Sequence, residues 1–202
     1  MQTVAAPNAT HATHAMNASS ASSANPRTDQ DAVLTQWAAD EAACRERMHH
    51  SGVASAEQVR GLTGMQVFAA MLAGELPYPP ICDTLDFILV DASAGAAVFQ
   101  GRPQLCHYNP LGSVHGGWIA TLLDSCVGCA VHTRLPAGKN YTTAELKINY
   151  VRPVTTRTPL LRAIGQVIHV GTRMATADGR LVGPDGKLYA HASTTCFIFD
   201  AA

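Results

Sequence analysis

Residues suited to acyl-transfer chemistry lie close together between Asn109 and Arg134. His115 is followed by Gly116 and Gly117, and a helix beginning there would present unpaired backbone N–H groups at the positive end of its dipole. Asp124 follows within the same apolar stretch, where burying a lone carboxylate is costly unless another group pairs with it or uses it. N–H donors that stabilise an oxyanion, combined with a placed carboxylate, indicate acyl transfer.

The spacing within this helix limits what one chain can do. Seven residues separate Gly117 from Asp124, which puts them two turns apart on roughly the same face. At a rise of roughly 1.5 Å per residue they are about 10 Å apart along the axis. Both groups therefore cannot contact one reacting carbon, and we expect a second copy of the chain to complete the site.

The elements that must position these residues follow from the hydrophobic pattern. Residues 118–131 are apolar almost all round, which is typical of a buried helix. Other helices are expected at 31–50 and from Thr63, where Thr63 and Gln66 match a capping box. Strands are predicted at 84–90, 96–100, 142–151, 160–170, 174–182 and 187–199. Residues 102–108 would extend the second of these strands.

This order of elements predicts the fold class. Strands dominate after the central helix and their connections are short, so the sheet should be largely antiparallel and the fold α+β. In the strand at 142–151, apolar Leu146 and Ile148 alternate with polar Glu145 and Lys147. That alternation indicates one face on a core and one face towards polar surroundings.

The composition excludes several classes of function. The chain has 202 residues, of which 47% are hydrophobic and 14% charged, and its formal net charge is −1. Nothing in it suggests a nucleic-acid partner or an anionic membrane surface, and no apolar run is long enough to span a bilayer. We expect a disordered and then helical extension at residues 1–57 and the main domain at 58–202.

The cysteines are interpreted as reduced. The first ten residues lack the basic and apolar regions of a secretory signal, so a cytoplasmic location and free thiols are expected. Cys126 and Cys129 lie three residues apart on the central helix and read as small core residues, since no second pair would complete a zinc site. No metal site is predicted.

The chain resembles the hotdog-fold acyl-CoA thioesterases, most closely the phenylacetate-degradation (PaaI-like) branch. The resemblance covers roughly residues 60–200, whereas residues 1–57 have no counterpart in it. The segments that carry it are Asn109-x5-His115-Gly116-Gly117-x6-Asp124, the strand TAELKINYVRP at 143–153, Gly171-Thr-Arg173 and the segment at 186–197.

The resemblance implies a hotdog fold, with an antiparallel sheet wrapped around one long central helix. It implies a homodimer or homotetramer (a dimer of dimers) with active sites between subunits. The implied reaction is hydrolysis of an acyl-CoA to a free acid and coenzyme A, which is part of the substrate, so no separate cofactor is expected.

The resemblance also implies a role for individual residues. The N–H of Gly117 or Gly116 would polarise the thioester carbonyl, with His115 beside it. Asp124 would act as general base or nucleophile. Two further catalytic residues are implied, Asn109 to hold the water or the carbonyl and Thr143 to steady Asp124. The implied substrate-binding residues are Gly116, Arg152, Gly171 and Arg173.

Other interpretations stay open at this point. An ion pair with a basic side chain would also explain Asp124, and His115-Gly-Gly could be only a tight turn into a helix. The cations Arg152, Arg157, Arg173 and Lys139 would either meet coenzyme A phosphates or form a solvated surface. The alternative functions are a non-catalytic acyl-CoA-binding hotdog protein and a hotdog enoyl-thioester hydratase or dehydratase.

Overall fold

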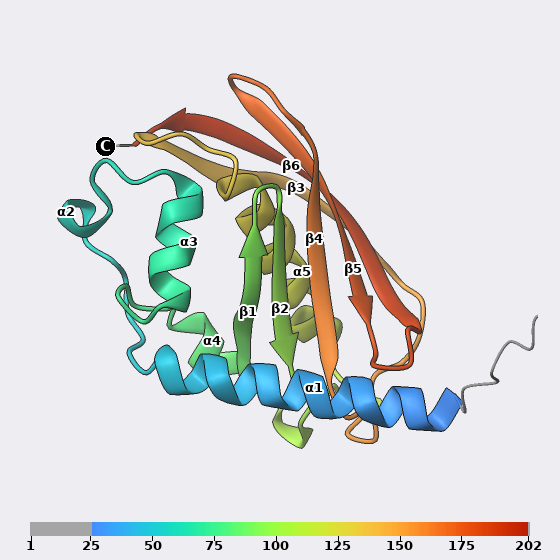
Figure 1. Ribbon diagram of the computed structural model, residues 1–202. Coiled ribbons are helices and arrows are strands. Elements are labelled where there is room, and N and C mark those ends of the chain that lie inside the picture. The colour runs from blue at the N-terminus through green and yellow to red at the C-terminus, as the bar shows by residue number, and fades with distance from the viewer. Residues whose placement is uncertain (1–25, 202) are drawn as a thin grey trace, which may run out of the picture.

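A computed structural model describes residues 26–201, so the disorder predicted at the start of the chain lies outside the described residues up to position 25. Figure 1 shows the elements in place. In chain order they are α1 (Pro26–Arg47), α2 (Ala56–Val59), α3 (Gly64–Leu72), α4 (Ile81–Leu85), β1 (Phe87–Ser93), β2 (Ala96–Gly101), a 3-10 helix (Leu105–His107), α5 (Gly116–His132), β3 (Lys139–Tyr150), β4 (Leu161–Val170), β5 (Met174–Val182) and β6 (Leu188–Asp200).

The strands form a single six-stranded sheet in the order β1-β2-β4-β5-β6-β3. Every neighbouring pair is antiparallel. The sheet curves around α5, which packs against all of its strands (Figure 1). This arrangement confirms the predicted α+β fold with an antiparallel sheet around one central helix. It also leaves β1 and β3 as the two edge strands.

Helix α5 is covered on one side only by its own chain, whereas its apolar composition is typical of a fully buried helix. Its large apolar side chains face the sheet, and Leu122, Leu123 and Val127 are fully buried. Thr121 and Asp124 lie on the other side and are half-buried. A stripe of small and polar residues on α5 therefore faces away from the sheet.

A β-bulge interrupts the pairing of β3 with β6. Thr143 is opposite Cys196 and Glu145 is opposite Thr195, so Ala144 is the extra residue. A bulge of this kind shifts the alternation of side chains by one position. As a result Thr143 faces inward, as Leu146 does three residues later, although an odd separation would place them on opposite faces of a regular strand.

Helix α1 crosses the outer face of the sheet, opposite to α5, along the end where β1, β2 and β4 lie (Figure 1). Its central contact is Arg162 of β4, whose guanidinium bonds to Asp40 at 2.7 Å and stacks 4.5 Å from the Trp37 ring. Gln100 of β2 is fully buried beneath the helix and donates to the Trp37 carbonyl at 3.0 Å.

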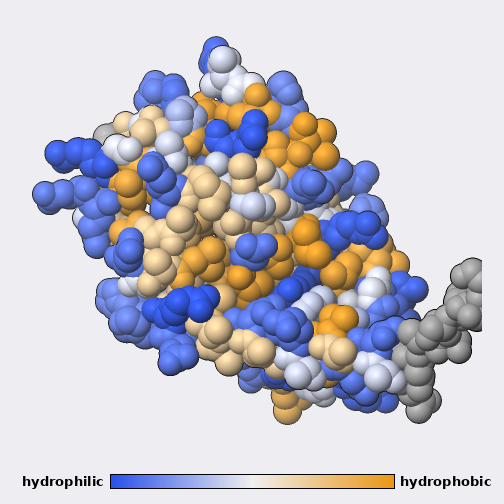
Figure 2. Space-filling model, in the orientation of Figure 1, coloured by the Kyte–Doolittle hydropathy of each residue, from blue (hydrophilic) through white to orange (hydrophobic). Residues whose placement is uncertain are grey.

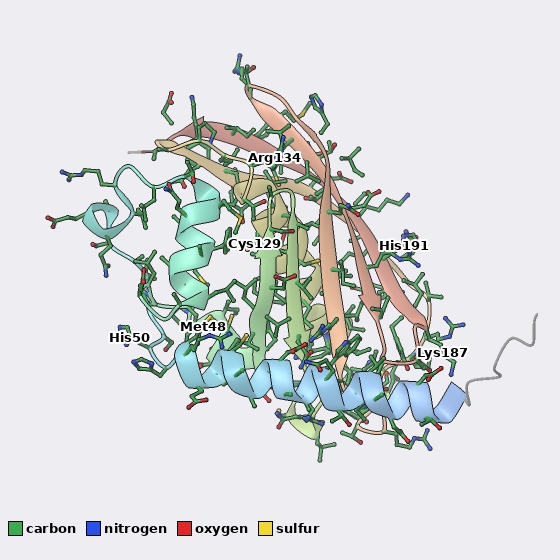
Figure 3. All side chains as sticks on the ribbon, viewed as in Figure 1. Met48, His50, Cys129, Arg134, Lys187 and His191 are labelled. Atoms are coloured by element: carbon green, nitrogen blue, oxygen red, sulfur yellow. The ribbon has the colours of Figure 1, made fainter. Side chains whose placement is uncertain are left out.

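The two ends of α1 are also placed by contacts with the sheet region. Its first turns border a cavity together with Lys187 of the β5–β6 turn, and Met48 is buried just beyond its last turn (Figure 3). Above α1 the outer face stays largely apolar (Figure 2), and Ile164 of β4 is exposed there. The helix thus covers one end of this face.

The structure differs from the predicted elements in three places. Residues 84 and 85, predicted to begin a strand at 84–90, instead end the short helix α4, and β1 begins only at Phe87. Pro79 and Pro80 favour a turn at the start of α4. Residues 102–108 leave the sheet, and Gln104 and His107 cap a 3-10 helix instead. Between the helices expected at 31–50 and from Thr63, the structure has the short additional helix α2, capped by Ser55. The Thr63 capping box is confirmed.

The remaining features of the described chain concern thiols and membrane spans. All six cysteines carry free thiols. Among residues 26–201, no helix has both the length and the apolar composition that crossing a bilayer requires.

Replacing Gly165 by alanine should strongly destabilise the protein. Gly165 of β4 lies against the backbone of α5, and a Cβ there would be 2.1 Å from the Cys126 carbonyl oxygen. A backbone group cannot turn away as a side chain can, so we expect the unfolding free energy to fall by about 3 kcal/mol. Urea denaturation measures this, with Gly52→Ala as control, because a Cβ at Gly52 makes only ordinary contact at 3.4 Å. Equal stability of the two variants would contradict the close approach.

Candidate active site

Asp124 and Thr143 form the first part of the candidate site. Asp124 lies in the middle of α5, and Thr143 Oγ1 on the neighbouring strand β3 donates a hydrogen bond of 3.0 Å to its Oδ1. None of the ion pairs found among residues 26–201 involves Asp124. Within one chain the carboxylate is therefore held by a neutral hydroxyl, and its second oxygen is left for another group.

The start of α5 forms the second part. His115 is the N-cap residue with an extended backbone (φ −62°, ψ 136°), and its Nδ1 accepts a hydrogen bond of 2.8 Å from Gly117 N–H. Because of that bond, the Gly117 N–H is already engaged and does not point to a substrate oxygen as a free donor. Gly116 is the first residue of the helix, where a backbone N–H has no acceptor within the helix. Of the two glycines, Gly116 is therefore the better candidate for an oxyanion donor.

A cavity of about 280 Å³ opens beside this helix start. Gly116 and Ile119 line it from α5, and Tyr150 and Arg152 line it from the end of β3. The Tyr150 hydroxyl donates to the Gly116 carbonyl at 3.1 Å, and Arg152 Nη1 donates to the Leu188 carbonyl at 2.6 Å. The structure thus brings Arg152 and Gly116, two of the expected substrate-binding residues, to the same cavity.

Tyr150 is a site residue that the sequence argument did not identify. A Cβ built on Gly116 would lie 3.2 Å from the Tyr150 ring, so the ring forms a wall against the helix start. The alternation of Leu146 and Ile148 along the strand, continued by two residues, puts Tyr150 on their side, and this signal could have identified it.

The side chain of Asn109 forms hydrogen bonds within its own loop, whereas the resemblance implied that it holds the water or the carbonyl. Its Oδ1 accepts hydrogen bonds from Leu111 N–H at 2.9 Å and Ser113 N–H at 3.3 Å, and its Nδ2 donates to Ser113 Oγ at 3.2 Å. These bonds close the loop that leads into α5. In the structure Asn109 therefore shapes the approach to the helix start, with its own amide already engaged.

Gly171 and Arg173 lie far from the helix start of their own chain. They form the turn between β4 and β5, where Gly171 N–H donates to the Met174 carbonyl at 2.8 Å. Strand β4 begins opposite Gly101, which lies against Trp118 of α5, and runs ten residues away from it before this turn. Only a second subunit could bring these two residues to a site built around Gly116.

The cysteines of α5 are unsuited to nucleophilic chemistry. Burial raises the pKa of Cys129 to about 12 and raises the pKa of Cys126 well above its ordinary value. A thiol with such a pKa carries little thiolate at neutral pH. Cys129 lies within the fold on α5 (Figure 3). In the described part of the chain, no three His, Cys, Asp or Glu side chains are grouped to hold a metal ion.

Comparison with known proteins adds to this geometry. The sequence profile of the thioesterase superfamily matches residues 111–190, which include the helix start, Asp124 and Thr143. A candidate esterase of Halobacterium salinarum is 39% identical over 75 residues. That match covers 36% of this chain and 48% of the relative, so the chain spans about half the length of this curated relative.

Solved structures with the same fold include two proteins linked to phenylacetic acid degradation. The chain is similar to a degradation-related protein of Ralstonia eutropha JMP134, with 30% identity and a TM-score of 0.59, covering 64% of this chain and 98% of that one. It is also similar to a point mutant of the degradation protein PaaI of Thermus thermophilus. There the identity is 27% and the TM-score 0.53, covering 58% of this chain and 97% of that one.

Proposed function

This chain belongs to the thioesterase superfamily, in its PaaI-like branch, and we propose that it hydrolyses an acyl-CoA to a free acid and coenzyme A. The observation that carries the proposal is the hydrogen bond from Thr143 to Asp124 on α5. It holds a carboxylate on the open side of a helix that begins with His115-Gly116. Thioester hydrolysis needs both a placed carboxylate and backbone N–H donors for the carbonyl oxygen, and Asp124 and the helix start supply them.

The reaction follows from these parts. Attack on the thioester carbonyl carbon places negative charge on the carbonyl oxygen, and the Gly116 N–H at the positive end of α5 stabilises it. Asp124 either takes a proton from the attacking water or attacks the carbon itself and forms an anhydride that water then opens. In both cases the carbon–sulfur bond breaks, coenzyme A leaves as a thiolate that takes up a proton, and the acid is released.

A second copy of the chain would supply the missing half of each site. Strand β3 is an edge strand of twelve residues, so its outer backbone groups are available for pairing with another β3. A two-fold axis across that edge would place the two α5 helices side by side in opposite directions. The start of one helix would then face the Asp124 of the other, which removes the separation of about 10 Å within one chain.

Acyl-CoA as the substrate class is supported by the cation at the site. Arg152 lines the cavity beside Gly116, and its Nη1 donates to the Leu188 carbonyl. A planar guanidinium suits phosphate oxygens. Arg173 would join the site only from the neighbouring subunit.

A thiol-release assay with purified protein tests the function directly. Short, long and aromatic acyl-CoAs are compared, and we expect release of coenzyme A from at least one of them. Saturable acyl-CoA binding without thiol release would instead indicate a binding protein. Hydration of an enoyl-CoA without thiol release would indicate a hydratase.

Removing the Thr143 hydroxyl should slow turnover without disturbing the fold. Thr143→Val keeps the shape of the side chain but deletes the donor to Asp124 Oδ1. Because a misoriented carboxylate lowers the rate of attack, we expect kcat to fall about tenfold. Thr143→Ser keeps a hydroxyl and should stay within about twofold of the parent. A Val variant as active as the Ser variant would show that the hydrogen bond does not orient Asp124 for catalysis.

A further inference from the structure

The start of α5 rests on a chain of contacts that reaches back to the N-terminal helix α1. Its residues from Arg45 to His107 lie before position 111 and so outside the region that matches the thioesterase superfamily, and they meet α5 at His115 and Trp118. Of these residues only His107 contacts the candidate site, through His115 N–H. Their contacts converge on the turn that aims the Gly116 N–H.

The last contacts of the chain hold the turn itself. His107 lies beneath the helix start, and its carbonyl accepts a hydrogen bond of 2.7 Å from His115 N–H. Its imidazole stacks on the Trp118 ring at 5.1 Å between centroids, with the planes 21° apart. The Trp118 indole in turn donates to the Leu85 carbonyl at 2.8 Å. His107 and Trp118 are both nearly fully buried, so this contact has little freedom to shift.

The next contacts fix His107. Gln104 and His107 cap the 3-10 helix reciprocally, since Gln104 N–H donates to His107 Nδ1 at 3.1 Å and His107 N–H donates to the Gln104 carbonyl at 3.1 Å. Burial lowers the pKa of His107, which keeps the imidazole neutral and able to accept this bond. The Gln104 side chain extends the other way and donates from Nε2 to Oδ2 of Asp86.

Asp86 is where the chain of contacts meets α1. Its other oxygen, Oδ1, forms an ion pair with Arg45 Nη2 of α1 at 2.8 Å, while Arg45 Nε bonds to Glu41 at 2.9 Å. Asp86 ends α4 in the left-handed conformation (φ 48°, ψ 62°), and it is the one non-glycine residue in the described part of the chain with a positive φ. Such a conformation persists where surrounding contacts hold it.

We propose that Asp86 is a positioning residue for the α5 helix start, oriented by Arg45 of α1 and acting through Gln104 and His107. The proposal rests on the proposed function, because it assigns these residues to the same site. Both partners of the Arg45–Asp86 pair are more than a third exposed, so the pair contributes little to stability. The Arg45–Asp86 pair acts by fixing the position of the Asp86 carboxylate. Helix α1 is then part of the active-site support.

An exchange of donor and acceptor tests the link between Asp86 and Gln104. Asp86→Asn loses the carboxylate that accepts from Gln104, although asparagine tolerates the left-handed backbone. Gln104→Glu places two carboxylates against each other. In the double variant, the asparagine amide at position 86 can donate to the glutamate carboxylate at position 104, which restores the bond in the opposite sense. Asp83→Asn removes a carboxylate from the same helix α4 and serves as the control.

Two measurements are made on each full-length variant. Hydrogen exchange of the amides at 113–119 reports the helix start, and we expect each single variant to exchange about tenfold faster and the double variant to recover. For hydrolysis we expect kcat to fall about tenfold in each single variant with KM within about twofold, again with recovery in the double variant. Arg45→Met should change both readouts about threefold, and Asp83→Asn should change neither.

The outcomes separate this inference from the proposed function. Parent-like exchange and kcat in Asp86→Asn, or no recovery in the double variant, would overturn the role of Asp86. A silent Arg45→Met would overturn the role of α1. If the parent releases no thiol from any acyl-CoA, the proposed function fails, while the exchange series still decides whether Asp86 positions the helix start.

Discussion

Asp124→Asn is expected to lower kcat for acyl-CoA hydrolysis about 10³-fold, whichever of its two catalytic roles Asp124 performs. An amide neither takes a proton from water nor attacks a thioester, and a general base alone contributes roughly 10²- to 10⁴-fold. The asparagine Oδ1 can still accept the hydrogen bond from Thr143, so the fold of the variant should be intact. The thiol-release rate of purified protein measures the effect.

The control for this variant removes a carboxylate from the sheet instead of from helix α5. Asp178 is exposed on β5, and Asp178→Asn should leave the rate unchanged. Equal rates for Asp124→Asn and the parent would exclude Asp124 from the reaction. A single turnover of the parent in heavy-oxygen water then separates the two roles, because only an anhydride intermediate would leave the label in the Asp124 carboxylate.

Mixing two inactive variants should restore activity if each site contains residues of two chains. Gly116→Pro deletes one backbone donor, and a proline at the first helical position suits the extended His115 before it. Loss of an oxyanion donor should lower kcat about 10²-fold or more. Gly116→Ala is the matched control, since its Cβ meets the Tyr150 ring at the same 3.2 Å but its N–H remains.

The expected recovery follows from counting sites. When Gly116→Pro and Asp124→Asn subunits are unfolded together and refolded in equal amounts, about half of the dimers contain one of each. In such a dimer one site carries both defects and the other carries neither. The mixture should therefore show about a quarter of the parent activity. If Gly116 and Asp124 acted within one chain, every site would carry a defect and no recovery would be seen.

The sequence pattern was sufficient for the central elements of the fold. A stretch that is apolar almost all round identified α5, and period-two alternation identified β3. Such signals are local, because each depends on residues within one element. Errors arose where a distant contact decides the structure. Residues 102–108 look like a strand continuation, yet they turn away because Gln104 bonds to Asp86 from a different part of the chain.

In the candidate site, too, local sequence signals identified some residues, whereas the position of Thr143 could not be read from them. Asp124 and the glycines were visible as a costly carboxylate and a donor-rich helix start. Alternation alone would have turned Thr143 to the side of Glu145, away from Asp124, because the extra residue Ala144 leaves no clear mark in the sequence. The resemblance to a known family placed Thr143 beside Asp124, and the bulge explains how the strand does so.

Helix α1 has a consequence for how dimers could assemble further. It lies across the outer face of the sheet and is anchored through Arg162, Asp40 and Trp37. A second dimer that stacked sheet against sheet over β1, β2 and β4 would collide with it. While α1 is in place, a tetramer would have to use the uncovered part of that face or the side on which the two α5 helices of the proposed dimer would lie. Helix α1 would thereby restrict the symmetry of such an assembly.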